Sequence, residues 1–302
     1  MIKLPEGVNI NNLIHDLRIF SWEACDVLIY YSQILRDSNN KSNILQNAKS
    51  EDPVTLADLK VNEIIIQRIN QKYKNIDWEI LSEENSKIES NFCNLNKDWL
   101  WVLDPLDGTK DFIQGTSHYA MHLALSFKQK PYLGIVLIPE RNELWISNGE
   151  KVWCETKDYY QTNPKLSKKT NLKDMIVITS KNHKNQILSN LINKIGFKKV
   201  TTMGSIGCKV ASIIRGDSDI YISLSLPSRS SPKDWDFAAP EAILKAAGGA
   251  ITNLDNEDLT YCKKNFEQGG IIIASSNKQI HEELCLQIKE TIKKYDLYPL
   301  NY

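Results

Sequence analysis

The sequence has no excess charge of either sign and no long apolar run. Its 302 residues include 37 Lys and Arg and 37 Asp and Glu, so the formal net charge is zero. A chain without a net field has no global attraction to nucleic acid or to an anionic membrane, and we expect neither as a partner. No apolar run approaches the roughly 20 residues that a bilayer-spanning helix needs, so we expect no membrane segment.

Cysteine is also scarce and unpatterned. The six cysteines are scattered, with no CxxC pair and no pairing with histidine at zinc spacing, which argues against a disulfide scaffold or a zinc fold. The first residues, MIKLPEGVNINN, lack the apolar segment of a secretory signal. We therefore expect reduced thiols and a cytoplasmic location.

What the chain does have is a change of hydrophobic period along its length. Apolar residues recur at helical spacing over 12–36, and Thr55 with Asp58 indicates a shortened capping box for a second helix. From 99 to 154 the pattern changes to five short strands joined by tight turns, which is typical of antiparallel pairing. Farther along the chain strands and helices alternate, which favours a second α/β layer.

Two subdomains follow from this change of pattern. We predict an N-terminal α+β subdomain over residues 1–165, which carries most of the acids of interest, and a C-terminal α/β subdomain over 166–302. The polar stretch 156–174 resembles a linker between them. The expected fold class is therefore layered α/β.

The stretch WVLDPLDGTKDF at 101–112 is the most informative one. Asp104 and Asp107 flank a proline at the end of an apolar strand. Carboxylates and a backbone carbonyl are the hard oxygen ligands that Mg²⁺ prefers. Because Pro105 cannot extend a β-ladder, we expect the strand to end there and the Leu106 carbonyl to point at an ion.

Residues around this stretch extend the same chemistry. Gly108 lets the backbone approach a ligand closely, and a helix that opens at Thr109 offers N–H groups to a phosphate. Further acids follow strands or begin helices, namely Glu83, Asp236 and Asp58. Two Mg²⁺ ions about 4 Å apart can clamp a phosphate and lower the pKa of a bound water. Each acid alone has an ordinary structural explanation, but their combination predicts a phosphoester hydrolase.

Two histidines of the sequence are candidates for further metal ligands. His118 and His122 are four residues apart, which is metal spacing only if the segment is helical. The segment has the pattern of a strand, in which the two side chains share a face without converging. We therefore assign neither histidine a metal role.

The motifs together resemble the inositol monophosphatase superfamily of lithium-sensitive, Mg²⁺-dependent phosphatases. The resemblance covers nearly the whole chain and rests on five segments: PVTLAD at 53–58, SEE at 82–84, DPLDGTKDF at 104–112, WDFAAPEAILKAAGG at 235–249 and GGIIIAS at 269–275. It implies an αβαβα sandwich with an antiparallel N-terminal sheet and a mostly parallel C-terminal sheet. It also implies that a homodimer is an expected assembly.

The resemblance implies a role for each matching residue. The implied ligands of two or three Mg²⁺ ions are Glu83, Asp104, the Leu106 carbonyl, Asp107 and Asp236. The implied catalytic residues are Glu83, Asp58 and Thr109, of which the last two orient the attacking water. The implied phosphate cradle is the backbone of Gly108 and Thr109.

Within the superfamily, LDPLDGTKDFI is similar to the 3′(2′),5′-bisphosphate nucleotidases of the CysQ type. That branch implies a small nucleotide substrate, 3′-phosphoadenosine 5′-phosphate, which is cleaved to AMP and phosphate. A second phosphate calls for polar and cationic groups away from the metals, and our candidates are Ser205, Lys209 and Arg229.

Two alternatives stay open. One is a phosphatase of the same superfamily that acts on inositol monophosphate, fructose bisphosphate or another sugar phosphate. The other is a non-catalytic sensor of a nucleotide or a metal.

Overall fold

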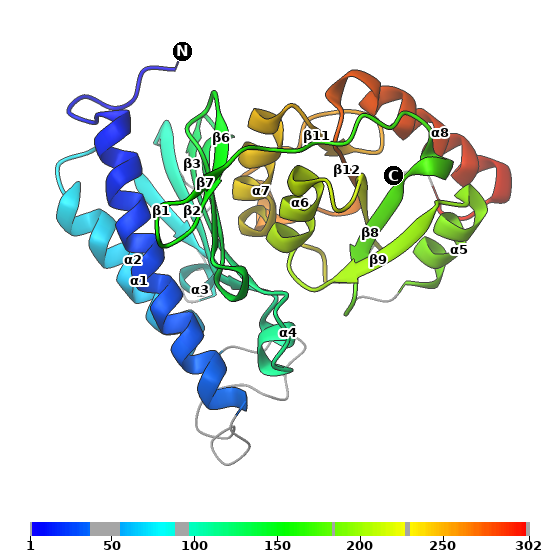
Figure 1. Cartoon of the computed structure of the whole chain (residues 1–302). Helices are drawn as coiled ribbons and strands as arrows, with labels where there is room; N and C mark the ends of the chain where they lie inside the picture. Colours follow the sequence, from blue (N-terminus) through cyan, green and yellow to red (C-terminus); the bar gives the residue numbers. More distant parts are fainter. Residues whose placement is uncertain (1, 37–54, 88–96, 183–184, 227–229, 300–302) are drawn as a thin grey trace.

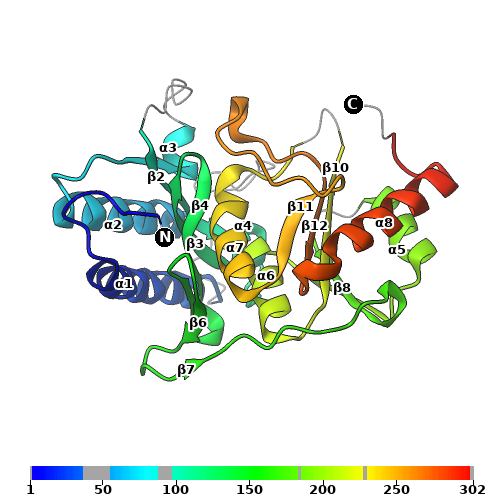
Figure 2. The same ribbon diagram turned by 90° about the horizontal axis from the view of Figure 1, so that it is seen from above.

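The protein forms five layers of alternating helices and sheets (Figure 1). The computed structural model describes residues 2–36, 55–87, 97–182, 185–226 and 230–299. A helix pair, a seven-stranded sheet, a second helix pair, a five-stranded sheet and an outer helix pair follow one another across the molecule, as the view from above also shows (Figure 2). The expected layered α/β class is confirmed.

The first two layers are built from the N-terminal half. Two helices cover the outer face of the first sheet: α1 (Ile10–Arg36) and α2 (Leu56–Lys72). The strands of the sheet lie side by side in chain order: β1 (Glu79–Ser82), β2 (Trp99–Asp107), β3 (Ala120–Phe127), β4 (Lys130–Ile138), β5 (Glu143–Ser147), β6 (Val152–Glu155) and β7 (Gln161–Thr162). All pairs from β2 to β7 are antiparallel, as the tight turns predicted, whereas β1 runs parallel to β2.

The remaining layers come from the C-terminal half. Between the sheets lie α6 (Ile206–Arg215) and α7 (Asp234–Ala247). The second sheet has the order β11 (Ala250–Asn253), β12 (Gly270–Ser275), β10 (Ile220–Ser225), β8 (Ile176–Ser180) and β9 (Lys199–Met203). Its outer face is covered by α5 (Gln186–Ile195) and α8 (His281–Tyr295).

The second sheet is mixed and not mostly parallel as expected, because two of its four strand pairings are antiparallel. β8 pairs in parallel with β9 and β10, as expected for a βαβ arrangement. β12 is antiparallel to β10 and to β11, a four-residue strand that the sequence pattern did not indicate. Short helical segments complete the fold: α3 (Glu83–Ser86), α4 (Thr109–Ile113), η3 (Pro139–Arg141), η4 (Leu172–Asp174), η5 (Lys264–Phe266) and η6 (Lys278–Ile280).

Three clusters of buried apolar residues fill the interfaces between the layers. One joins α1 and α2 to the first sheet, and another joins the second sheet to α5 and α8. The middle cluster contains Val136 of the first sheet, Phe237 of α7 and Ile272 of the second sheet. The two halves therefore share a core, and the division at 165/166 stays a prediction.

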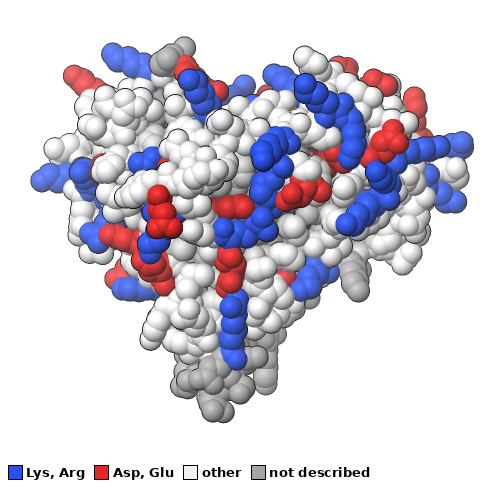
Figure 3. Space-filling model, viewed as in Figure 1, with Lys and Arg blue, Asp and Glu red and all other residues white. Residues whose placement is uncertain are grey.

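The described surface matches the balanced composition. On the face shown in Figure 3, Lys and Arg are interspersed with Asp and Glu. In the described part of the chain, no helix has both the length and the apolar character needed to cross a bilayer. The five described cysteines are free thiols, and Cys93 lies outside the described residues.

We predict that Gly134→Ala destabilises the protein, because Gly134 of β4 lies directly against α7. A Cβ at this position would lie 2.7 Å from both the Ala239 carbonyl oxygen and the Ala242 Cβ. The free energy of unfolding, measured by urea denaturation, should fall by about 1–3 kcal/mol. Gly269→Ala is the matched control, since its Cβ would meet nothing within 4 Å. Equal losses in both variants would contradict the close packing of α7 on β4.

Candidate metal centre

Three acids meet where β2 ends and α7 begins. One carboxylate oxygen each from Asp104, Asp107 and Asp236 lies within 4.8 Å of the others. Asp104 and Asp107 are buried, and Asp236 is half-buried. The structure thus brings together three of the predicted metal ligands, of which Asp236 is far from the other two in the sequence.

The proline between the first two acids does not end β2, contrary to our expectation. The strand continues to Asp107, and its register with β3 shifts between Asp104 and Asp107. Because proline lacks an N–H, the ladder is interrupted there by an irregularity of the bulge kind, which redirects side chains without ending the strand. The Leu106 N–H donates to Asp104 Oδ1 at 3.0 Å. Both acids therefore contribute to one cluster.

The negative charges at this site repel one another. Burial, together with the charges of Glu83, Asp107 and Asp236, raises the pKa of Asp104 well above its ordinary value. Glu83 begins α3 and pairs with Lys87 Nζ at 3.0 Å. A buried group of like charges is unfavourable unless a cation compensates it, and carboxylate oxygens suit Mg²⁺. The residues present therefore fit this ion.

Asp58 is oriented by the capping box that the sequence predicted. Its Oδ2 accepts hydrogen bonds from the Thr55 N–H at 2.8 Å and from the Thr55 hydroxyl at 2.5 Å. Its Oδ1 lies 3.5 Å from Thr109 Oγ1, and this hydroxyl donates to the Leu106 carbonyl at 3.0 Å. Burial raises the pKa of Asp58 to about 7. The predicted Asp58–Thr109 pair thus lies beside the predicted carbonyl ligand.

Gly108 forms the turn between β2 and α4. Its φ of 90° lies in the left-handed region that glycine tolerates. A Cβ here would also lie 2.7 Å from the His118 carbonyl oxygen. Thr109 then begins α4, and the role of this backbone in phosphate binding stays a prediction.

Asp107 is held by the first turn of α6. Its Oδ2 accepts hydrogen bonds from the Ser205 hydroxyl at 2.6 Å, the Ile206 N–H at 2.5 Å and the Gly207 N–H at 3.2 Å. The helix N-terminus therefore stabilises the negative charge of this carboxylate. Ser205, our candidate for substrate binding, is fully buried and donates its hydroxyl proton to the metal site.

Lys209, also on α6, is buried. Its Nζ donates to the Gly204 carbonyl at 2.6 Å and lies 5.3 Å from the centre of the Tyr221 ring. Burial lowers its pKa, and the nearby Asp107 and Asp236 oppose this shift. A direct contact of Lys209 with substrate stays a prediction. Arg229, the remaining candidate, lies outside the described residues.

His122 lies against this site, which its position in the sequence does not indicate. Its Nε2 lies 3.3 Å from Asp107 Oδ2, and burial lowers the pKa of the ring. His118 instead lies near Asp111, with its Nδ1 3.9 Å from Oδ1. The two histidines do not converge, as expected, but the β2–β3 register places His122 opposite Asp104. Residue spacing does not encode that register.

Asp111, which helped to indicate the branch of the superfamily, is a fully buried anchor. It accepts hydrogen bonds from the Thr116 hydroxyl at 2.6 Å, from Lys181 Nζ at 3.1 Å and from the Asn182 side chain. A Cβ on Gly204 would lie 2.1 Å from Asp111 Oδ2, so the approach of α6 requires a glycine there. Asp111 therefore connects α4 to the segment that follows β8.

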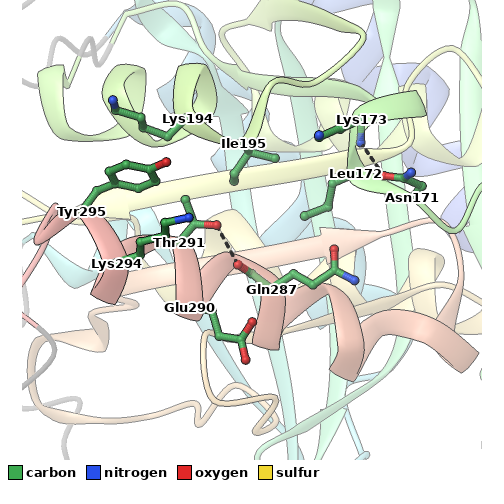
Figure 4. A pocket seen from close by; sticks show the side chains of 10 residues that line it. All are labelled: Asn171, Leu172, Lys173, Lys194, Ile195, Gln287, Glu290, Thr291, Lys294 and Tyr295. Carbon is green, nitrogen blue, oxygen red and sulfur yellow. Dashed lines mark hydrogen bonds between the residues drawn. The ribbon is translucent and has the colours of Figure 1, made fainter.

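A separate hollow of about 340 Å³ lies between α5 and α8 in the outer layer (Figure 4). Its lining includes Lys194, Lys294 and Tyr295, with Lys194 Nζ 4.6 Å from the centre of the Tyr295 ring. None of its lining residues belongs to the acidic cluster. We therefore assign it no part in the site.

Known proteins resemble the chain over most of its length. The model of the Inositol monophosphatase family matches residues 20–293. The 3′(2′),5′-bisphosphate nucleotidase CysQ of Buchnera aphidicola is 31% identical over 211 residues, which cover 69% of this chain and 74% of that protein. The 3′(2′),5′-bisphosphate nucleotidase of Dictyostelium discoideum is 28% identical and covers 82% of this chain and 89% of that protein.

Solved structures share the fold. An inositol monophosphatase from Anabaena has a TM-score of 0.69 at 22% identity and covers 94% of this chain and 97% of its own. The extragenic suppressor protein suhB from Bartonella henselae has a TM-score of 0.71 at 20% identity and covers 94% of this chain and 99% of its own. Together with the acidic cluster and the curated relatives, the layered fold defines an α/β phosphatase. The chain belongs to the inositol monophosphatase family, whose model spans nearly all of it.

We predict that Asp104→Asn stabilises the metal-free protein and weakens Mg²⁺ binding. The folded state holds a proton on Asp104 more tightly than the unfolded state does, so stability falls as the pH rises and the proton is lost. The melting temperature in EDTA should therefore rise in the variant, and more at about pH 8 than at about pH 4, near the ordinary pKa of an aspartate. Added Mg²⁺ should raise the melting temperature of the variant less than that of the wild type. A ligand that binds the folded state stabilises it more, the higher its affinity, and the variant lacks one ligand for the ion.

Asp98→Asn is the control for this prediction, since the Asp98 side chain is 63% exposed. It should change neither the melting temperature in EDTA nor the increase caused by Mg²⁺. An Asp104→Asn protein that keeps the full Mg²⁺-induced increase would exclude Asp104 as a metal ligand.

Proposed function

We propose that the protein is a Mg²⁺-dependent, Li⁺-sensitive phosphomonoesterase that hydrolyses the 3′-phosphate of 3′-phosphoadenosine 5′-phosphate to give AMP and phosphate. The observation that carries the reaction is the acidic triangle of Asp104, Asp107 and Asp236 beside the Asp58–Thr109 pair. The substrate is supported by curated relatives named 3′(2′),5′-bisphosphate nucleotidase at 27–31% identity.

The chain offers a complete set of oxygen ligands for two or three Mg²⁺ ions. The proposed ligands are Glu83, Asp104, the Leu106 carbonyl, Asp107 and Asp236. When bound, Mg²⁺ would neutralise negative charge on the ester phosphate and lower the pKa of a coordinated water. The hydrogen bonds on Asp107 Oδ2 leave Oδ1 to face an ion.

Asp58 and Thr109 orient the attacking water in this proposal. Thr55 occupies Oδ2 of Asp58, so Oδ1, beside the Thr109 hydroxyl, accepts the proton of the water. A carboxylate with a pKa of about 7 is well matched to proton transfer near neutral pH. The backbone of Gly108 and Thr109 holds the phosphate, and the water attacks in line without a covalent phosphoenzyme.

The second phosphate of the substrate is read by cations in this proposal. Lys209 contributes positive charge close to Asp107 and Asp236. Ser205 supports the site through Asp107, and Arg229 remains the candidate for a direct charged contact.

Phosphate release with Mg²⁺ tests the proposal on 3′-phosphoadenosine 5′-phosphate, AMP and inositol 1-phosphate, each with and without Li⁺. We expect fast, Li⁺-sensitive release from the bisphosphate and almost none from AMP, because AMP lacks the 3′ ester. Preference for inositol 1-phosphate would keep the metal site and overturn the nucleotide substrate. Binding of the nucleotide without any release would instead indicate a sensor.

A further inference from the structure

The residues just before Asp236 are held by a segment from another part of the fold. This segment, 262–268, lies between β11 and β12 and meets the start of α7. The Gln268 N–H donates to the Pro232 carbonyl at 2.8 Å. The chain that leads into α7 is therefore paired with backbone that comes much later in the sequence.

Lys233 connects this segment to the predicted metal ligand. Its Nζ donates to the Asn265 carbonyl and to Glu267 Oε1, each at 3.1 Å. Its backbone N–H donates to Asp236 Oδ2 at 2.5 Å, and its carbonyl accepts the Asp236 N–H at 3.1 Å. The position of Lys233 therefore sets the orientation of the Asp236 carboxylate.

Asp234 is the buried centre of the contact, with 1% of its surface exposed. Its Oδ2 accepts a hydrogen bond from the Cys262 N–H at 2.6 Å, and its Oδ1 accepts one from Gln268 Nε2 at 2.6 Å. Hydrogen bonds to a carboxylate are about twice as strong as those between neutral groups. One carboxylate thus joins both ends of the 262–268 segment to the first residue of α7.

The segment has a strained backbone that depends on these contacts. Cys262, Asn265 and Phe266 have φ values of 59°, 63° and 57°, in the left-handed region that residues other than glycine seldom adopt. Such strain persists only where the surrounding structure holds it. Asp234 holds Cys262, and the Phe266 ring lies 5.9 Å from that of Trp235, measured between centres. A change at Asp234 should therefore alter both the segment and the first turn of α7.

We propose that Asp234 is a positioning residue of the metal centre, which fixes the 262–268 segment on the first turn of α7 and thereby the direction of the Asp236 carboxylate. The inference rests on the proposed function only in that Asp236 helps to hold a cation, and it is independent of the substrate. Contacts that orient a metal ligand typically contribute tenfold to a hundredfold to metal affinity.

Asp234→Asn tests the proposal by calorimetric titration of Mg²⁺. The Asn side chain has the same shape but only one acceptor oxygen, so either the Cys262 N–H or the Gln268 amide is left facing an N–H group. The variant should bind Mg²⁺ about tenfold more weakly than the wild type. An unchanged Kd for Mg²⁺ would overturn the proposal.

Gln268→Leu separates the position of the segment from the charge of Asp234. This variant removes the donor to Asp234 Oδ1 but keeps the carboxylate, so a weaker affinity for Mg²⁺ cannot arise from a lost negative charge. It should also weaken Mg²⁺ binding, and the loss in the double variant should be smaller than the sum of the two single losses. An unchanged Kd in Gln268→Leu would overturn the role of the segment, and this test holds even if Asp234→Asn does not fold.

Asp219→Asn is the matched control. Asp219 is also 1% exposed, and its Oδ2 accepts hydrogen bonds from the Ile176 N–H at 2.6 Å and from Lys169 Nζ at 2.8 Å. It precedes β10, whereas α7 follows the other end of that strand. A general loss of stability is thus common to both Asn variants, but only Asp234→Asn should weaken Mg²⁺ binding. Equal losses of Mg²⁺ affinity in both would show a merely structural role.

The same titrations keep the proposed function separate from this inference. A wild-type protein that binds Mg²⁺ but cleaves no phosphate would overturn the proposed function and leave the role of Asp234 to be decided by the variants. A wild-type protein that binds no Mg²⁺ would overturn both.

Discussion

Repulsion among buried carboxylates is the constraint on which the site depends. Burial and three neighbouring acids raise the pKa of Asp104, so the charged cluster is unfavourable by itself. The chain responds by holding one oxygen of each acid with a local donor: the Leu106 N–H for Asp104, the first turn of α6 for Asp107, the Lys233 N–H for Asp236 and Thr55 for Asp58. These hydrogen bonds orient the carboxylates, and a bound cation would offset the remaining repulsion between their negative charges.

The layers explain why the acids can meet at all. Asp104 and Asp107 lie on the first sheet, whereas Asp236 begins a helix that packs between the two sheets. The contact of Gly134 with α7 and the hydrogen bonds from α6 to Asp107 fix these helices against the first sheet. The buried core and the charged site are therefore formed by the same interface. Solved structures at 20–22% identity share this fold, which is consistent with an arrangement set by packing rather than by particular core residues.

The sequence predicted some parts of this arrangement well and others poorly. The acids were found because oxygen ligands, proline and glycine occur together in short motifs whose residue types define the chemistry. The predicted end of β2 was wrong. Pro105 lacks an N–H, which indicated that the strand ends there, but a bulge accommodates the proline and the strand continues. The strand β11 was not anticipated, since its four residues are too few for a clear alternation, and neither was the antiparallel pairing of the predicted strand β12 with its neighbours.

By itself, the sequence determined the features that depend on neighbouring residues. The capping box of Thr55 and Asp58, the left-handed turn at Gly108 and the helices with apolar periodicity are of this kind, because their contacts lie within a turn or two. Only the tertiary structure decided that Lys209 is buried and that His122 meets Asp107. These contacts depend on strand register and on packing between layers, which join residues whose separation in the chain carries no signal of their proximity.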